Sequence, residues 1–183
     1  RKKYEIRIVI IATEFWRKGV PELIKAIGIL KQRGYYINLD VIGAKRDEGE
    51  YNINYNTLCW DNYVQANVKF HGEVEFQKMV SLLQNADIFV MPTKYEAFGI
   101  PTLEAMSCGI PTITSKMGAG ELISNKRNGI HLDNPHDVNE IVEKIEMLIS
   151  DEKLRNILGE NARKTALEYT WKETANKTMK VYE

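Results

Sequence analysis

Two carboxylates lie on either side of a predicted helix start in the segment YEAFGIPTLEAM, residues 95–106. Glu96 precedes the Gly-Ile-Pro turn of this segment and Glu104 follows it. Ionised carboxylates only accept hydrogen bonds, so they repel phosphate and bind groups that donate, such as sugar hydroxyls. The spacing therefore indicates two sets of hydroxyls with another group bound between them.

The turn between the two glutamates predicts an anion site. Gly99 has no Cβ and allows a ligand to approach the backbone closely. Pro101 suits the first turn of a helix, where its missing N–H costs nothing. The free amides of Phe98, Gly99 and Ile100 would point toward a ligand, and the helix dipole favours a negative charge there. A nucleoside diphosphate sugar has the required layout, because its diphosphate separates the hexose from the ribose.

Each glutamate taken alone also fits a structural role. Glu104 would gain about 0.3–1 kcal/mol from the helix dipole in a first helical turn, and Glu96 would be a solvated loop residue. The two glutamates together with the turn favour the binding interpretation.

A second loop, TEFWRKGV, supplies cations before another predicted helix. Arg17 and Lys18 precede Gly19 there, and a cation at this place would neutralise a diphosphate across the crevice. Such a charge-assisted hydrogen bond contributes about 1.5–3 kcal/mol. An exposed pair of solvated cations is the alternative interpretation, and the residues alone leave both open.

Two further loops have two interpretations each. In FHGEVEF, the backbone at Gly72, Glu73 and Val74 would face a nucleobase, or the segment is a plain turn between strand and helix. In KMGAGE, Gly118 and Gly120 line a sugar pocket or form a tight turn.

Alternating apolar segments predict the elements that position these loops. The predicted strands are residues 5–12, 37–43, 67–71, 87–91, 111–115 and 128–132. Helical spacing predicts helices from Pro21 to Gly34, at 57–65, 76–83 and 101–108, from a cap at Asn134 to Leu148, from Asp151, and at 171–183. A surface loop is predicted at 45–56. We expect an α/β fold with a Rossmann-like parallel sheet of about six strands, helices on both faces and further C-terminal helices. Ligands bind such sheets at the carboxyl ends of the strands.

Composition excludes several classes of protein. The 183 residues are 44% apolar and 27% charged, ordinary for a soluble globular domain, and 25 basic residues balance 25 acidic ones. A general nucleic-acid binder would need a basic face. Cys59 and Cys108 are too few for a disulfide framework, and no apolar run approaches the length of a membrane span. No signal peptide opens the chain, whose abrupt start indicates a piece of a longer protein.

Cofactor motifs are absent from the sequence. It has no Asp-x-Asp pair at a strand end, no Cys/His cluster with metal spacing, no G-x-G-x-x-G after the first strand and no Walker loop. We therefore expect neither a metal nor a cofactor. His71, His131 and His136 are interpreted as structural.

The motifs FHGEV, PTKYEAFGIPTLEAMSCGIPTITSKMGAGELI and NGIHLD resemble the retaining glycosyltransferases of family 4. The resemblance covers nearly the whole chain. It implies that residues 1–183 form a single nucleotide-sugar donor domain, one half of the two-domain GT-B fold. The other half, an N-terminal acceptor domain, has no counterpart in these residues. The segment 171–183 resembles the helix that packs back toward that domain.

The resemblance also implies a role for each matching residue. Glu96 contacts the transferred sugar, the backbone of 98–100 faces the sugar and diphosphate, and Glu104 holds the ribose. Lys18 matches the lysine that contacts the diphosphate. The family often has an arginine at the position of Thr13, which leaves the diphosphate one cation short unless Arg17 compensates.

The expected function is metal-independent sugar transfer with retention of configuration, with Glu96 and Lys18 as the catalytic pair. The partners would be a nucleotide sugar, the acceptor domain and an unknown acceptor alcohol. The expected location is the cytoplasm, with peripheral association of the full-length enzyme at the inner membrane face. The alternatives are half of a nucleotide-sugar epimerase, a non-catalytic nucleotide-sugar-binding subunit, and a flavodoxin-like signalling domain. The last would need an acidic cluster after the first strand, where this chain has Arg17 and Lys18.

Overall fold

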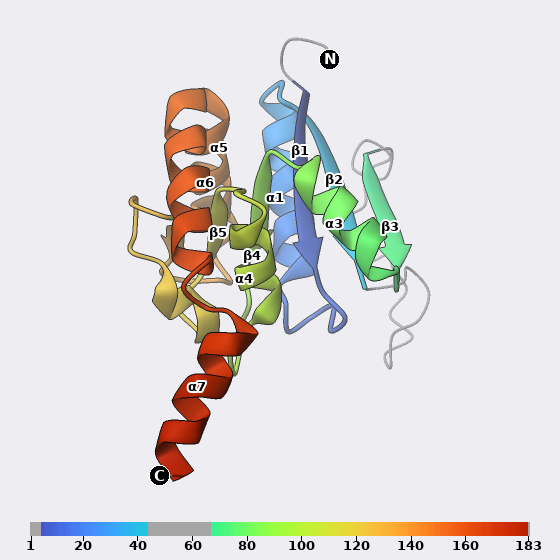
Figure 1. Ribbon diagram of the computed structural model, residues 1–183. Helices are drawn as coiled ribbons and strands as arrows, with labels where there is room; N and C mark the ends of the chain where they lie inside the picture. Colours follow the sequence, from blue (N-terminus) through green and yellow to red (C-terminus); the bar gives the residue numbers. More distant parts are fainter. Residues whose placement is uncertain (1–4, 44–66, 183) are drawn as a thin grey trace.

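The computed structural model describes residues 5–43 and 67–182, which form one parallel sheet covered by helices on both faces (Figure 1). The strand order is β3-β2-β1-β4-β5-β6, and every neighbouring pair is parallel. The predicted α/β fold is confirmed. The predicted loop 45–56, the predicted helix 57–65 and Cys59 lie outside the described residues.

The central strands of the sheet are buried on both faces, whereas the edge strand β3 is only partly buried. Their bounds are β1 Glu5–Ile11, β2 Tyr36–Ile42, β3 Val68–Gly72, β4 Ile88–Met91, β5 Thr112–Ser115 and β6 Ile130–Leu132. All four residues of β4 are buried, as expected for a strand in the middle of a parallel sheet. The six strands match those predicted from the sequence to within two residues at each end.

The helices cover the sheet through their apolar stripes. Their bounds are α1 Val20–Gln32, α3 Phe76–Gln84, α4 Ile100–Ser107, α5 Val138–Ser150, α6 Glu152–Ala166 and α7 Trp171–Tyr182, with a 3₁₀ helix, η2, at Gly118–Leu122. Helices α1 and α5 pack against each other on one face, whereas α4 packs against α6 and lies with α3 on the other (Figure 1). Helix α7 buries no side chain and extends away from the sheet.

The predicted cap of α5 is wrong. The helix begins at Val138, and Asp137 rather than Asn134 accepts hydrogen bonds from the first-turn amides of Asn139 and Glu140. Asn134 instead accepts a hydrogen bond from the amide of His136, two residues on, which closes a local turn before the helix. Both residue types favour capping, so the sequence alone did not separate them.

Candidate functional site

The candidate site lies where the strand order reverses. From β1 the chain proceeds outward to β2 and β3, and then returns to β4 on the other side of β1. The loops that follow β1 and β4 therefore diverge from neighbouring strand ends, which is where ligands bind in open α/β sheets. Residues 12–19 and 92–99 form these two loops, and both had been singled out from the sequence.

The loop after β1 places Lys18 against the loop after β4. Gly19 adopts a left-handed conformation (φ 75°) and forms the N-cap of α1. A Cβ at this position would collide with the carbonyl of Pro92, so the two backbones pack more closely than any side chain would allow. This close packing leaves Lys18 only 5% exposed.

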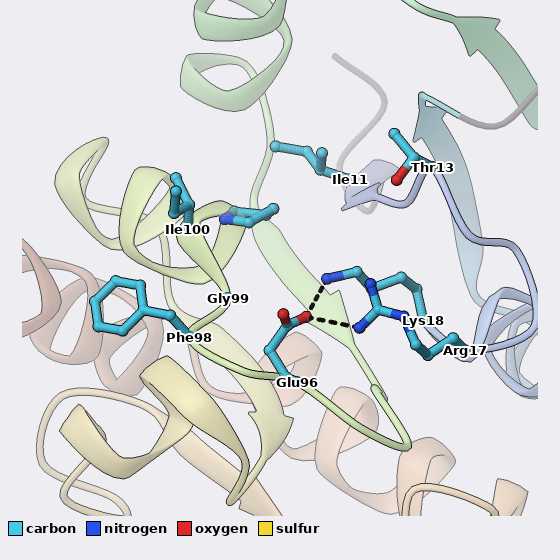
Figure 2. A pocket seen from close by; sticks show the side chains of 9 residues that line it. Ile11, Thr13, Arg17, Lys18, Glu96, Phe98, Gly99 and Ile100 are labelled. Atoms are coloured by element: carbon cyan, nitrogen blue, oxygen red, sulfur yellow. Dashed lines mark hydrogen bonds and ion pairs between the residues drawn. The ribbon is translucent and has the colours of Figure 1, made fainter.

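Lys18 and Glu96 form an ion pair between the two loops (Figure 2). The Lys18 ammonium donates a hydrogen bond to Oε2 of Glu96, and the side chains are 6% and 10% exposed. An ammonium has three N–H donors, so Lys18 retains donors for a second partner. The two residues predicted to be the catalytic pair are thus in direct contact.

Arg17 lies beside this pair. Its Nε and Nη2 each donate to the carboxylate of Glu14 at 2.6 Å, and its Nη1 donates to the carbonyl of Tyr95 at 2.6 Å. The same Nη1 is 3.4 Å from Oε2 of Glu96. Hydrogen bonding to Glu14 raises the pKa of Arg17, and the guanidinium in turn lowers the pKa of the Glu14 carboxyl. The alternative of a solvated Arg17–Lys18 pair is therefore wrong for Lys18 and only partly right for Arg17, whose side chain is 29% exposed.

These side chains border a cavity of about 340 Å³. The last residue of β1, residues of both loops and the start of α4 line it: Ile11, Thr13, Arg17, Lys18, Glu96, Phe98, Gly99, Ile100 and Pro101. The Phe98 ring points away from the ion pair in Figure 2, so Phe98 presents its backbone to the site. Thr13 lines the cavity where the resemblance implies an arginine.

The amides at the start of α4 are available to a ligand. Gly99 is the N-cap of α4 in a left-handed conformation (φ 84°), and Ile100 is the first helical residue. Among the described residues, the amides of Phe98, Gly99 and Ile100 have no hydrogen-bond acceptor. Three unsatisfied N–H groups and a helix N-terminus beside a buried lysine form an electropositive concavity.

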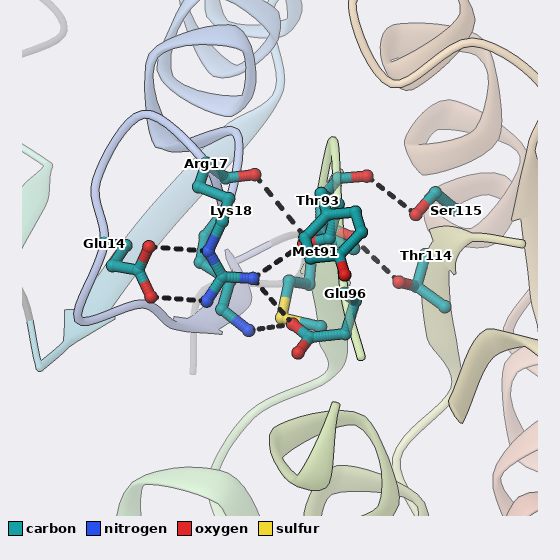
Figure 3. Close-up of polar contacts among 9 residues, drawn as sticks. Glu14, Arg17, Lys18, Met91, Thr93, Glu96, Thr114 and Ser115 are labelled. Atoms are coloured by element: carbon teal, nitrogen blue, oxygen red, sulfur yellow. Dashed lines mark hydrogen bonds and ion pairs between the residues drawn. The ribbon is translucent and has the colours of Figure 1, made fainter. Parts of the chain in front are cut away.

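The end of β5, shown in Figure 3, and the residues after it hold the loop after β4 in place. Ser115 donates to the carbonyl of Thr93 at 2.7 Å, and the amide of Ala119 donates to the carbonyl of Phe98. Gly118 (φ 55°) packs against that same carbonyl so closely that a Cβ would collide with it. Gly118 and Gly120 belong to η2, which supports the site; neither glycine is among the residues that line the cavity.

Glu104 lies one turn into α4, outside the set of residues that line the cavity. It is half-buried, and burial raises the pKa of its carboxyl group. Within the part of the chain that the structure describes, its carboxylate has neither a hydrogen-bond donor nor a cation as partner. A half-buried carboxylate without a donor gains stability from any hydroxyl that reaches it.

The structure does not bring the loop after β3 into the cavity. Gly72 is buried at the end of β3, where its carbonyl accepts a hydrogen bond from the Gly43 amide at 2.7 Å. Glu73 is exposed and Val74 packs against the core. Of the described residues that line the cavity, none comes from this loop.

The histidines have structural partners. His71 Nε2 lies 2.5 Å from Asp40 Oδ1, and His131 Nε2 lies 2.8 Å from the Gly120 carbonyl. His136 is exposed. The contacts of His71 and His131 agree with the structural interpretation of these two residues.

Sequence reasoning missed Glu14 and Glu22. Glu14 lies three residues before Arg17, a spacing that suits an ion pair within one turn, and this was the available signal. Glu22 binds Lys94 across the loops, and no local pattern indicates that contact.

Two further properties concern the described residues only. No group of His, Cys, Asp or Glu side chains among them is arranged to hold a metal ion. None of the helices in this part of the chain combines the length and apolar character needed to cross a bilayer.

The fold and site together define a Rossmann-like domain with a cavity at its topological switch point. The model of the glycosyl transferases group 1 family matches residues 1–165, so the chain belongs to this family.

Two curated relatives are similar to this chain over part of their own length. The N,N'-diacetylbacillosaminyl-diphospho-undecaprenol alpha-1,3-N-acetylgalactosaminyltransferase of Campylobacter jejuni is 33% identical over 183 residues, which cover 96% of this chain and 44% of that protein. The capsular polysaccharide biosynthesis glycosyltransferase CapM of Staphylococcus aureus is 33% identical over 148 residues, 80% of this chain and 37% of CapM. The chain thus spans less than half the length of these relatives.

Solved structures share the fold. The C-terminal domain of a glycosyl transferase group 1 family protein (LpcC) from Francisella tularensis has a TM-score of 0.71 and 30% identity, covering 90% of this chain and 85% of that one. The Anabaena protein Alr3699/HepE, in complex with UDP and glucose, has a TM-score of 0.80 and 22% identity, covering 98% of this chain and 48% of HepE. The fold is therefore that found in GT-B glycosyltransferases.

Proposed function

We propose that this chain is the donor-binding half of a retaining glycosyltransferase that takes a nucleoside diphosphate sugar as its donor. The observation that carries the proposal is the cavity at the switch point, where three unsatisfied amides at the start of α4 face the same space as Lys18 and Glu96. Membership of the glycosyl transferases group 1 family supports it.

The diphosphate would bind to the amides of residues 98–100 and to Lys18. Lys18 keeps N–H donors after it has bound Glu96, so it reaches the diphosphate without breaking that ion pair. Arg17 would be the second cation, because its guanidinium borders the cavity opposite the start of α4. The guanidinium of Arg17 would then replace the positive charge of the arginine that the resemblance implies at the position of Thr13.

The two glutamates would bind the sugars at either end of the diphosphate. Glu96 lies in the cavity and orients the hydroxyls of the transferred hexose, which supplies the positioning part of catalysis. Glu104 binds the ribose hydroxyls; its half-buried carboxylate without a donor supports this assignment. The nucleobase would extend out of the cavity, toward the backbone of Gly72, Glu73 and Val74.

Sugar transfer follows from charge stabilisation of the leaving group. The bond between the anomeric carbon and the diphosphate oxygen breaks, and the acceptor oxygen bonds to the anomeric carbon on the same face of the sugar. The proton of the acceptor hydroxyl passes to the leaving diphosphate. Lys18 and the N-terminus of α4 stabilise the negative charge that develops on the diphosphate, an interaction worth about 2.7–4 kcal/mol when donors are already in place. In this proposal no metal takes part, because Lys18, Arg17 and the amides supply the positive charge.

The acceptor would bind to a separate N-terminal domain. Because α7 buries no side chain in this chain, we assign it to the contact with that domain. Alone, the chain would bind donor and turn it over slowly, since the cleft lacks its acceptor wall. The full-length enzyme would work in the cytoplasm, at the inner face of the membrane.

Calorimetric titration of the chain with uridine, guanosine and adenosine diphosphate glucose tests the proposal, and the corresponding N-acetylgalactosamine nucleotide extends the test to the sugar named for the Campylobacter relative. We expect one nucleotide to bind with a free energy of about −4 to −8 kcal/mol. Absence of binding to every nucleotide sugar would contradict it. Incubation of the full-length protein with a labelled donor and no acceptor separates the alternatives, because an epimerase alters the sugar under these conditions.

A further inference from the structure

Two ion pairs join the start of α1 to the loop after β4, and the positive residue comes from a different segment in each pair. Lys18 binds Glu96, and Glu22 Oε1 lies 2.8 Å from Lys94 Nζ. Each segment therefore supplies one positive and one negative residue: Lys18 and Glu22 near the start of α1, and Lys94 and Glu96 in the loop after β4. We call Glu22 and Lys94 the outer pair, since neither lines the cavity.

The outer pair is largely shielded from water. The Glu22 side chain is 15% exposed and that of Lys94 is 25% exposed. Oε2 of Glu22 is buried and, among the described residues, has no hydrogen-bond partner. The His136 ring also lies nearby, with its Nδ1 3.9 Å from Oε1 and its side chain 61% exposed. Lys94 is therefore the main compensation for a buried carboxylate.

The backbone around Lys94 is fixed at the same point. The Lys94 amide donates to the Arg17 carbonyl at 2.9 Å, and Thr93 Oγ1 donates to the Tyr95 carbonyl at 2.9 Å. Glu96 comes two residues after Lys94. These contacts tie the backbone just before Glu96 to the start of α1.

We propose that Glu22 and Lys94 are positioning residues that hold Glu96 at the sugar end of the site. The inference rests on the proposed function, in which Glu96 binds the hexose. It implies that the outer pair controls the preference for a nucleotide sugar over the bare nucleotide, although neither residue touches the ligand. The α4 amides would contact the diphosphate without Glu96, and Lys18 keeps N–H donors for it, so affinity for the bare nucleotide would change little.

The test compares affinities for UDP-, GDP- and ADP-glucose with those for UDP, GDP and ADP in the wild-type chain, Glu22→Gln and Lys94→Met. We expect the preference for the sugar-bearing form to fall about tenfold in each variant, as displaced positioning groups commonly cause. Affinity for the bare nucleotide should stay within about twofold of wild type. The exchanged pair Glu22→Lys/Lys94→Glu should recover most of the preference. Lys116→Met, which breaks an exposed pair with Asp133, is the matched control and should change neither affinity.

Two results would overturn the inference: an unchanged preference in both single variants, or no recovery in the exchanged pair. The charge-free double variant Glu22→Gln/Lys94→Met replaces any single variant that fails to fold, and it should lose the preference as well. A crystal structure of Lys94→Met tests the positioning without a ligand, since an undisplaced Glu96 would refute it. If the wild-type chain binds no nucleotide at all, the proposed function fails, and this crystal structure still decides whether the outer pair positions Glu96.

Discussion

The Lys18 ammonium contacts Oε2 of Glu96 although the two residues are 78 positions apart. The contact joins the loop after β1 to the loop after β4, at the point where the strand order reverses. With side chains only 6% and 10% exposed, each charge depends on the other for compensation. The pair therefore has a structural effect that can be measured separately from ligand binding.

Lys18→Met should destabilise the chain by about 3 kcal/mol, because it leaves the Glu96 carboxylate buried without its main partner. This is the low end of the usual range, since Arg17 Nη1 remains 3.4 Å from Glu96. The double variant Lys18→Met/Glu96→Gln should recover most of the loss. Guanidinium unfolding measures both free energies, and equal destabilisation in the single and double variants would contradict a coupled pair.

Glu104→Ala should weaken nucleotide binding by about 1.5–3 kcal/mol, the amount typical of a hydrogen bond to a charged group. Calorimetry on UDP, GDP or ADP measures the effect without the hexose. Glu160→Ala on the exposed side of α6 is the matched control. Equal affinity for Glu104→Ala and wild type would remove the ribose assignment.

Glu104 also gives a pH dependence of stability. Burial raises the pKa of its carboxyl group, so the folded chain holds the proton more tightly than the unfolded chain. Its contribution to stability is therefore lost as the pH rises from the ordinary value of 4.5 through the raised folded-state pKa. Glu104→Gln should gain stability relative to wild type across this range. Urea unfolding between about pH 4 and pH 7 measures the difference, and a constant difference would contradict a raised pKa.

The sheet, and the loops that form its binding edge, were predictable because each depends on local patterns. The fully buried β4 is an unbroken apolar run, and Gly99 with Pro101 marks the start of α4. The contact between Lys18 and Glu96 was not predicted, although each residue was chosen separately. Their pairing depends on how the loop after β1 packs against Pro92. No local sequence pattern indicates this contact between distant segments.

Some predictions depend on choices that sequence patterns do not resolve. Asn134 and Asp137 are equally good caps, and which one serves depends on where β6 ends and α5 meets α1. Gly118 was expected either to line the pocket or to turn the chain. Its close contact with the Phe98 carbonyl gives it a third role, that of supporting the loop after β4.

Gly118→Ala should lower stability by more than about 2 kcal/mol and weaken nucleotide-sugar binding. A left-handed alanine costs about 1–2 kcal/mol by itself, and the added Cβ would collide with the Phe98 carbonyl. Gly34→Ala is the matched control, since Gly34 is also left-handed (φ 92°) and has open space around it. Thermal unfolding should show a smaller loss in the control and no change in its binding. Similar losses in both variants would mean that the contact with Phe98 contributes nothing.

Arg17→Met should weaken nucleotide-sugar binding by about 1.5–3 kcal/mol if Arg17 replaces the cation missing at Thr13. Removing a charge that faces the diphosphate should also reduce the salt dependence of binding, because less charge is screened. Arg17→Lys should restore only part of the affinity, since an ammonium lacks the planar fork that binds Glu14 through two hydrogen bonds at 2.6 Å.

Glu14→Gln separates the two roles of Arg17. Glu14 is 59% exposed and does not line the cavity, so its loss should cost at most about 1 kcal/mol of stability. Without the carboxylate that holds its Nε and Nη2, the guanidinium of Arg17 should be less well placed for the diphosphate. Calorimetry at two salt concentrations should then show weaker binding with the wild-type salt dependence. Full affinity in both Arg17→Met and Glu14→Gln would mean that Arg17 only joins the two loops through the Tyr95 carbonyl, and that Lys18 and the α4 amides bind the diphosphate without it.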